Sequence, residues 1–514
     1  MAKTASRSST SLKANSIGIV GSVAMCMAFM GPAISVAYNT PAAAGGAGYA
    51  LPLSIVLAMI ACLLVANSIA AFARKLPSSG FAYTYNSHGF GPSGGFLSGW
   101  LMTIAYGMVG PMIIAAFGGF GSGFLASQFG IHIPWEVVSV VFTVVIWAII
   151  AAGISESAKV ALVFLTVEVG IVTALTITIL AKGGSGGLSL EPFNPAHSLK
   201  GIGGLGTGML WGILMFIGFE SVATLGEEAK GSRRTIPIAL FTAVIVIGAF
   251  YVFAAYGAAT GFGLHGAGAF AASQSPWSTL AQKFWGGTAV LTLTVMASAF
   301  ANAVTGSNSI VRILHAMGRE SILPRPLGRT SGKGVPQTAL GCYMLFSLAF
   351  ALLVGLKYGA FGVWDFCGTL LGIGLCIIYI AVSIAVVRFY LKQHRTEFRW
   401  LRHALLPGLT VVVILLPIYG QIHPLPAYPN DWAVYLIPIW MVIGGGYLYY
   451  LKTRRPELIS AMGRVFEGGT PATSSAAGPG QLVVEGLGSP LGQLSGQAAA
   501  ERAALADETG SGRS

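Results

Sequence analysis

The sequence predicts an all-α polytopic membrane protein with twelve transmembrane helices. The 514-residue chain is 54% hydrophobic and only 9% charged, whereas soluble proteins carry about 25% charged residues. Apolar runs of about 20 residues, the length that crosses a bilayer, recur along nearly the whole chain. Basic residues concentrate in alternate loops between these runs. No soluble domain of useful size is left beside them.

The apolar runs divide the chain into three parts. A polar N-terminal segment, 1–16, precedes a twelve-helix domain at 17–452. The remaining residues, 453–514, are rich in Gly, Ser, Ala and Pro and predict a disordered cytoplasmic tail. The twelve expected spans lie at approximately 17–43, 50–73, 93–125, 134–154, 158–181, 203–226, 237–261, 286–314, 337–356, 364–389, 404–422 and 432–451.

The positions of the basic residues predict the topology. With twelve spans, every Lys and Arg falls on one side of the membrane except Lys182, Lys200, Lys283 and Lys357. Cytoplasmic loops are enriched in Lys and Arg, so we expect both termini in the cytoplasm of a multi-pass plasma membrane protein. The Gly- and Ala-rich sequence, in which no organelle signal is evident, favours a bacterial cell membrane. The net charge of +12 is therefore a matter of topology, and no nucleic-acid partner is expected.

Glycine interrupts two of the spans at corresponding places. The first span contains "AMCMAFMGPAISVAYNTPAAAGG" and the sixth contains "GMLWGILMFIGFESVATLGEE". Aligning their F-x-G stretches places Gly31 on Gly218, which divides the first ten spans into candidate repeats at about 17–181 and 203–389. A second copy of five helices has the opposite membrane orientation because five is odd. Paired broken helices of this kind indicate a binding site near the middle of the membrane.

A broken helix offers two kinds of backbone group to a ligand. Free N–H groups at the start of the second half bind a carboxylate, and free C=O groups at the end of the first half bind a cation. A zwitterionic amino acid matches this pair. Pro32 has no N–H, so the donors of the first break must come from Gly31, Ala33 or Ile34.

Two acidic residues, Glu168 and Glu220, lie well inside predicted spans. A carboxylate at that depth is costly unless it is hydrated, paired or protonated, so each is a candidate proton carrier. The alternative is a permanently protonated glutamate that is hydrogen-bonded to a backbone group or a hydroxyl. The sequence has no catalytic motif, and its five cysteines lie within spans without a C-x-x-C pair. We therefore expect neither an enzyme nor a metal or other cofactor.

Three sequence blocks resemble one known family. "MFIGFESVATLGEEAKGSRRTIPIAL", "ANAVTGSNSIVRILHAMGRESILPRPLGRTSGKGVPQTAL" and "KLPSSGFAYTYNSHGFGPSGGFLSGWL" are similar to parts of the amino acid–polyamine–organocation (APC) superfamily permeases of the amino acid permease type. The resemblance covers roughly residues 15–452. It implies a LeuT-like five-plus-five inverted repeat with helices 1 and 6 broken. It also implies that substrate binds on the two broken segments, at Met30, Gly31, Pro32, Ala33, Ile217, Gly218, Phe219 and Glu220.

The resemblance also implies roles for other residues. A charged side chain in the fifth span couples transport to protons in relatives, and Glu168 stands at that position. In the first break, "MGPAI" replaces the G-S/T-G of many relatives, which leaves the substrate class open. Leu214 stands where some relatives carry an aromatic gate, so Trp211 and Phe216 are the gate candidates.

These observations together predict a secondary active transporter that moves an amino acid by alternating access, in symport with protons. A polyamine or amine importer is an alternative, because the spans contain two acids and no base. An amino acid exchanger is another, and a non-transporting membrane sensor is a third, although no large soluble output domain is present. The expected partners are an amino acid or amine, protons and the lipid bilayer, and the oligomeric state is open.

Overall fold

The computed structural model describes residues 17–76, 80–153, 158–185, 187–225, 229–273, 275–319, 322–331 and 335–456. These residues form helices and connecting loops, with one isolated bridge between Ile17 and Ala229. They belong to one compact unit. Nearly all of the expected C-terminal tail, from residue 457 onward, lies outside the described residues.

Helices occupy each of the apolar runs. The long elements are α1 (Ile19–Met30), α2 (Pro32–Ala47), α3 (Leu51–Ala73), α5 (Pro92–Gly107), α6 (Val109–Phe129), α7 (Trp135–Ala151), α8 (Ala158–Ala181), α9 (Gly201–Phe216), α10 (Ser232–Phe262), α13 (Ala289–Arg319), α14 (Gln337–Gln393), α15 (Leu406–Ile422) and α16 (Asp431–Arg454).

Shorter elements connect them and were not expected from the sequence. They are the helices α4 (Phe81–Phe90), α11 (Ala267–Ala272) and α12 (Pro276–Trp285), the 3₁₀ turns η1 (Gly48–Ala50), η2 (Glu191–Phe193), η3 (Pro195–His197), η4 (Phe219–Leu225), η5 (Leu264–Gly266), η6 (Arg325–Gly328) and η7 (Arg395–Glu397), and the π-helical turn η8 (Leu401–Leu405).

Nine helical segments of the described chain are long and apolar enough to cross a membrane. Two of them, Ile19–Ala73 and Gln337–Gln393, have 55 and 57 residues, more than twice the roughly 20 that one crossing needs. Each contains a glycine with positive φ, Gly48 at 60° and Gly359 at 71°, where the helix changes direction. The all-helical, multi-pass fold is thus confirmed, and the number of twelve spans stays a prediction.

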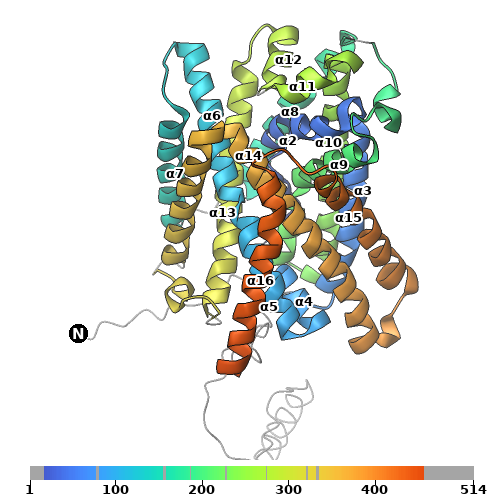
Figure 1. Cartoon of the computed structure of the whole chain (residues 1–514), viewed down its shortest axis with the longest axis vertical. Coiled ribbons are helices and arrows are strands. Elements are labelled where there is room, and N and C mark those ends of the chain that lie inside the picture. The colour runs from blue at the N-terminus through green and yellow to red at the C-terminus, as the bar shows by residue number, and fades with distance from the viewer. Residues whose placement is uncertain are drawn as a thin grey trace, which may run out of the picture. The chain divides into compact units, whose positions relative to one another are not determined.

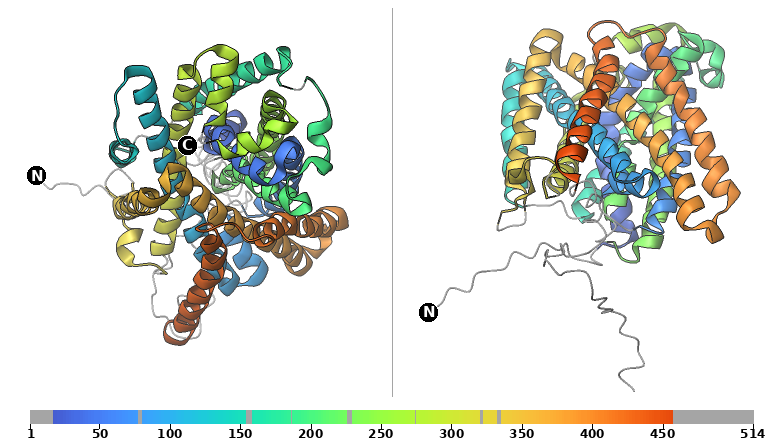
Figure 2. Two further views of the ribbon diagram at one scale, coloured as in Figure 1. Left: turned by 45° about the horizontal axis from the view of Figure 1, so that its top comes forward. Right: turned by 60° about the horizontal axis from the view of Figure 1, so that its bottom comes forward.

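The helices that carry the interrupted runs lie in the interior of the unit. The first run, α1 and α2, packs against α8, α9, α10 and α13, while α6 packs along α14. Helices α7, α15 and α16 lie at the periphery (Figures 1 and 2). The segments that the sequence singled out are therefore the ones that other helices surround.

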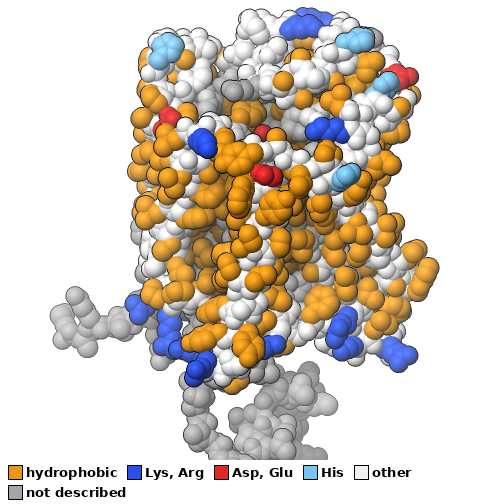
Figure 3. Space-filling view, viewed as in Figure 1, with side chains coloured by type: hydrophobic (Ala, Val, Ile, Leu, Met, Phe, Trp, Pro, Cys, Tyr) orange, Lys and Arg blue, Asp and Glu red, His pale blue; other side chains and the backbone are white. Residues whose placement is uncertain are grey.

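The outer surface is a broad apolar band. Large apolar side chains are exposed on the peripheral helices, including Val141 at 59%, Val412 at 65% and Val442 at 75%. On the face shown in Figure 3, Lys and Arg side chains gather at the end where α16 terminates, and acidic and His side chains lie near the opposite end. Exposed apolar area on this scale is typical of a lipid-facing surface.

Candidate functional site

The first helical run is interrupted at Gly31. Helix α1 ends at Met30, Gly31 adopts a left-handed conformation with φ 54°, and α2 begins at Pro32. Glycine adopts positive φ without a steric penalty, and proline at the first helical position loses no hydrogen bond. The Gly31 N–H donates to the carbonyl of Ala28 at 3.1 Å. The Gly-Pro pair thus encodes both the end of one helix and the start of the next.

The second interruption lies between α9 and η4. Helix α9 ends at Phe216, Ile217 is extended with ψ 128°, and Gly218 has φ 114°. The 3₁₀ turn η4 follows directly from Phe219. A φ of this value is open to glycine and strained for other residues, so the position of the break depends on Gly218.

The two interruptions are in contact with each other. A Cβ added at Gly218 would lie 2.9 Å from Cγ of Phe29 and 3.0 Å from its carbonyl carbon. The Cys26 thiol also donates to the carbonyl of Phe219 at 3.2 Å. Gly218 therefore allows the backbones of the two broken helices to approach closely.

Glu168 binds the start of α2. This side chain on α8 is 2% exposed, and its Oε2 accepts a hydrogen bond from the N–H of Ala33 at 3.3 Å. The first N–H groups of a helix have no partner within it and carry partial positive charge. The next N–H, of Ile34, donates to Oγ of Ser298 on α13 at 3.2 Å. The three N–H donors expected at the first break, those of Gly31, Ala33 and Ile34, are therefore all bound by acceptors within the protein.

Glu220 binds the second break. It is 1% exposed, accepts a hydrogen bond from the hydroxyl of Tyr106 on α5 through Oε1, and accepts one from the Gly218 N–H at 3.2 Å through Oε2. A buried carboxyl is tolerated when it is hydrogen-bonded in this way. Both of the acids that were singled out, Glu168 and Glu220, thus hold backbone groups of the interrupted segments.

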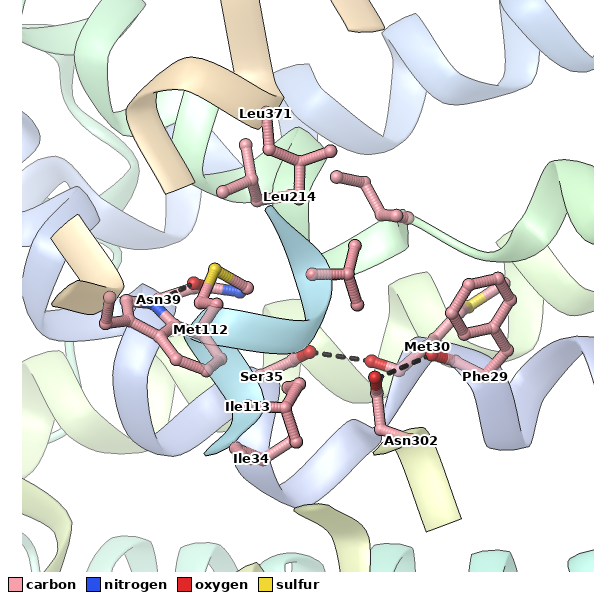
Figure 4. Close-up of a pocket in the computed structure, with 13 residues that line it drawn as sticks. Phe29, Met30, Ile34, Ser35, Asn39, Met112, Ile113, Leu214, Asn302 and Leu371 are labelled. Atoms are coloured by element: carbon pink, nitrogen blue, oxygen red, sulfur yellow. Dashed lines mark hydrogen bonds between the residues drawn. The ribbon is translucent and has the colours of Figure 1, made fainter. Parts of the chain in front are cut away.

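A small cavity lies where the two interruptions meet (Figure 4). Its volume of about 20 Å³ is room for about one water molecule. The polar groups around it are Ser35, Asn39 and Asn302, and none of the described lining residues is charged. The apolar wall is formed mainly by Met30, Ile34, Met112, Leu214, Ile217 and Leu371.

A cluster of four aromatic rings connects the lining of this cavity with that of a larger one. The larger cavity, of about 540 Å³, is lined in part by Tyr38, Phe120 and Phe361. The ring of Tyr38 stacks on Trp364 at 4.4 Å between centroids, contacts Phe361 at 4.5 Å and meets Phe120 edge-on at 5.2 Å. Trp364 lines the small cavity. We call these four residues the aromatic barrier.

The eight residues expected to bind substrate differ in their positions. Met30 and Ile217 line the small cavity. Gly31 and Gly218 form the breaks, while Ala33 and Glu220 are engaged in the hydrogen bonds described above. The remaining two expected residues, Pro32 and Phe219, are the first residues of α2 and η4.

Neither of the two expected gate residues is among those that line the small cavity. Trp211 packs against Gly368, where an added Cβ would lie 2.5 Å from its ring. Phe216 is fully buried and meets Tyr251 edge-on at 5.3 Å. Their role as gates stays a prediction. Sequence reasoning missed Asn39 and Asn302, although an amide inside an apolar run is a signal that could have found both.

The chain is similar to transport proteins over nearly its whole described length. A family model with the description "Amino acid permease" matches residues 21–460. The branched-chain amino acid permease BcaP of Lactococcus lactis is 25% identical over 431 residues, which cover 78% of this chain and 88% of that protein. BcaP of Bacillus subtilis is also 25% identical, over 457 residues that cover 83% and 90%. The low-affinity putrescine importer PlaP of Escherichia coli K12 is 26% identical over 370 residues, or 68% and 75%.

The Gly218→Ala variant tests whether the second break needs glycine. We expect a loss of about 1–3 kcal/mol in stability, because the new Cβ would meet Phe29 at a φ that alanine tolerates poorly. Thermal unfolding of the purified protein measures this. Gly170→Ala on α8 is the matched control, since its Cβ meets nothing within 4 Å. Equal melting temperatures for Gly218→Ala and the wild type would contradict the role of this break.

Proposed function

The chain belongs to the amino acid permease family, and we propose that it is a secondary active transporter that carries an amino acid across the plasma membrane by alternating access. The contact between two helix breaks beside one small cavity is the observation that carries this proposal. Irregular backbone at membrane depth is tolerated where it is buried in protein or lines a cavity. Paired broken helices are the usual place for a transported substrate.

The transport domain has twelve spans in this proposal. Nine segments are candidates, and two of them are long enough to divide: Ile19–Ala73 at Gly48 and Gln337–Gln393 at Gly359. With the shorter apolar helix Trp135–Ala151 added, the number becomes twelve. The first ten form the five-plus-five inverted repeat that the pairing of Gly31 with Gly218 suggests. The distribution of Lys and Arg favours cytoplasmic termini.

The substrate is an amino acid with an uncharged, apolar side chain. The cavity wall is mainly apolar, and its described lining has no carboxylate to pair with a second positive charge. Burying an unpaired ammonium group is expensive, which disfavours putrescine and other polyamines. The similarity to a putrescine importer keeps amine import as the second candidate, and exchange without ion coupling as a third.

Glu168 carries the coupled proton. As a carboxylate it binds the Ala33 N–H at the start of α2, where the helix dipole favours negative charge. Protonation removes that charge and weakens the hydrogen bond. Proton binding is thereby linked to the freedom of the first break to rearrange. Glu220, held by Tyr106 and Gly218, is the second candidate carrier and holds the shape of the other break.

The aromatic barrier controls access to the small cavity. A volume of about 20 Å³ cannot hold an amino acid, so the walls must move before substrate enters. Tyr38 and Trp364 lie between the two cavities and change neighbours when they open.

A thermal-shift screen tests the substrate class. Because a ligand that binds only the folded protein raises its melting temperature, we expect L-leucine, L-isoleucine or L-valine to stabilise the purified protein and putrescine to have no effect. Stabilisation by putrescine alone would favour the amine importer. No stabilisation by any amino compound would contradict the proposed function.

The Glu168→Gln variant tests proton coupling. We expect it to lose gradient-driven accumulation of the substrate in liposomes, because glutamine does not titrate, and to retain exchange of internal for external substrate. Glu397→Gln, which changes an exposed acid paired with Lys75, is the matched control and should accumulate substrate normally. Full accumulation by Glu168→Gln would leave Glu168 with a structural role only.

The Tyr38→Ala variant tests the aromatic barrier. In a Ser35→Cys, Cys342→Ser background, the new thiol lies on the small cavity and the other four cysteines are buried. We expect Tyr38→Ala to speed the reaction of that thiol with a membrane-impermeant reagent about tenfold. The control is Tyr390→Ala. Tyr390 lies near the C-terminal end of α14, where its ring stacks on His403. Unchanged labelling in Tyr38→Ala would place the barrier elsewhere.

A further inference from the structure

A groove runs between α14 and α15 on the outside of the helical unit. Its volume is about 360 Å³, within the range of about 300–1,000 Å³ that ligand pockets have. One wall is the C-terminal part of α14, from Ser383 to Lys392, and the other is the start of α15 with the π-helical turn before it, from Ala404 to Val411. The two helices pack against each other and lie at the periphery (Figures 1 and 2). The groove shares no described lining residue with the small cavity, so it is separate from the candidate substrate site.

Small residues on the α15 side leave the groove open. Pro407, Gly408 and Val411 line it from α15, and their spacing of three and four residues places them on one face of the helix. Ala404 lines it from the preceding turn. A Cβ added at Gly408 would meet nothing within 4 Å. The groove therefore exists because α15 presents little side-chain volume to α14 at this level.

The interior of the groove is apolar. Ile384, Val387 and Leu391 line it from α14, and the side chains of Ile384 and Leu391 are 45% and 48% exposed. The one uncharged polar side chain of the described lining, Ser383, is buried, and its hydroxyl is hydrogen-bonded with that of Ser68 on α3 at 3.2 Å. Apolar surface of this kind is more stable against hydrocarbon than against water. The interior therefore matches an acyl chain.

Two basic side chains line the groove toward the C-terminal end of α14. Arg388 and Lys392 are both exposed, and a spacing of four residues places them on the same face of the helix. Neither forms an ion pair or a side-chain hydrogen bond with another residue that the structure describes. Like charges one helical turn apart repel each other, and an anion between them would remove that repulsion. Figure 3 shows Lys and Arg side chains at this end of the two helices.

Helix polarity accounts for only one of these charges. Lys392 lies in the last turn of α14, where the helix dipole favours a cation, whereas Arg388 lies one turn earlier. Long basic side chains also extend from membrane helices toward the interface, but this does not account for the open groove beside them. Basic pockets between transmembrane helices on the cytoplasmic side bind anionic lipid headgroups. An apolar groove that ends at two unpaired cations has this character.

We propose that this groove binds one anionic phospholipid of the surrounding membrane, with its phosphate between Arg388 and Lys392 and one acyl chain along Ile384, Leu391 and Gly408. A phosphate accepts charge-assisted hydrogen bonds from both a guanidinium and an ammonium group. A zwitterionic lipid is disfavoured, because it brings a cation of its own toward the two basic side chains. The site lies on the lipid-facing side of the protein, so its test is independent of the proposed function.

Two lipids with the same acyl chains test the headgroup. Dioleoyl phosphatidylglycerol carries a net negative charge, and dioleoyl phosphatidylcholine carries none. We expect the purified full-length protein to bind the first lipid about tenfold more tightly, because each of the two basic residues contributes several-fold to binding of an anionic headgroup. The double variant Arg388→Gln, Lys392→Gln should reduce this ratio to about one. The control Lys452→Gln, Arg454→Gln removes the same charge from the last turn of α16 and should keep the ratio. Native mass spectrometry measures the affinity for the first bound lipid.

The Gly408→Trp variant tests the acyl-chain part of the site. The indole would fill the groove and leave both charges in place, so we expect phosphatidylglycerol to bind about tenfold more weakly, since each CH₂ that loses its apolar contact costs about a factor of four. Val411→Phe narrows the same groove and takes its place if Gly408→Trp does not fold. Gly446→Trp on α16, an exposed position where a Cβ also meets nothing within 4 Å, is the matched control and should bind as the wild type does.

Three results would overturn the proposal. Equal affinity of the wild type for the two lipids would show that the site does not select an anionic headgroup. A tenfold ratio that survives in the Arg388→Gln, Lys392→Gln variant would place the anionic lipid elsewhere. Unchanged binding of phosphatidylglycerol when the groove is filled at Gly408 would show that surface charge alone attracts the lipid.

Discussion

The account depends on one constraint: a helix that breaks inside a membrane must find partners for the backbone groups it frees. In this protein the partners are side chains, most of which come from distant helices. Glu168 and Ser298 accept from the start of α2, Asn302 donates to the end of α1, and Glu220 accepts from Gly218. Each partner replaces water that the bilayer cannot supply. The first break is therefore stable only because α8 and α13 pack against it.

The same hydrogen bonds link the breaks to function. The Glu168 carboxylate at the start of α2 occupies the place where an anionic group of a substrate would otherwise bind. In the proposed mechanism, protonation of Glu168 therefore frees the Ala33 N–H for another acceptor. The cavity beside it is too small for an amino acid, and the aromatic barrier covers it. In the proposed mechanism, binding, proton uptake and opening involve the same few residues, which is what coupled transport requires.

Much of this arrangement could be predicted from the sequence. The breaks at Gly31 and Gly218 follow from glycine in F-x-G within apolar runs, and Glu168 and Glu220 stand out as acids inside spans. Their partners could not be predicted, because Tyr106 and Ser298 lie over 100 residues away and look like ordinary span residues. The short helices α4, α11 and α12 were missed because their composition resembles that of loops.

A structure of the protein with L-leucine bound, determined by electron cryo-microscopy in lipid nanodiscs, tests the central claim most directly. The account predicts ligand density between the first break and Ile217, with Tyr38 and Trp364 displaced from the stacked positions that they have here. Density confined to the larger outer cavity, with the two breaks unchanged and still capped, would contradict it.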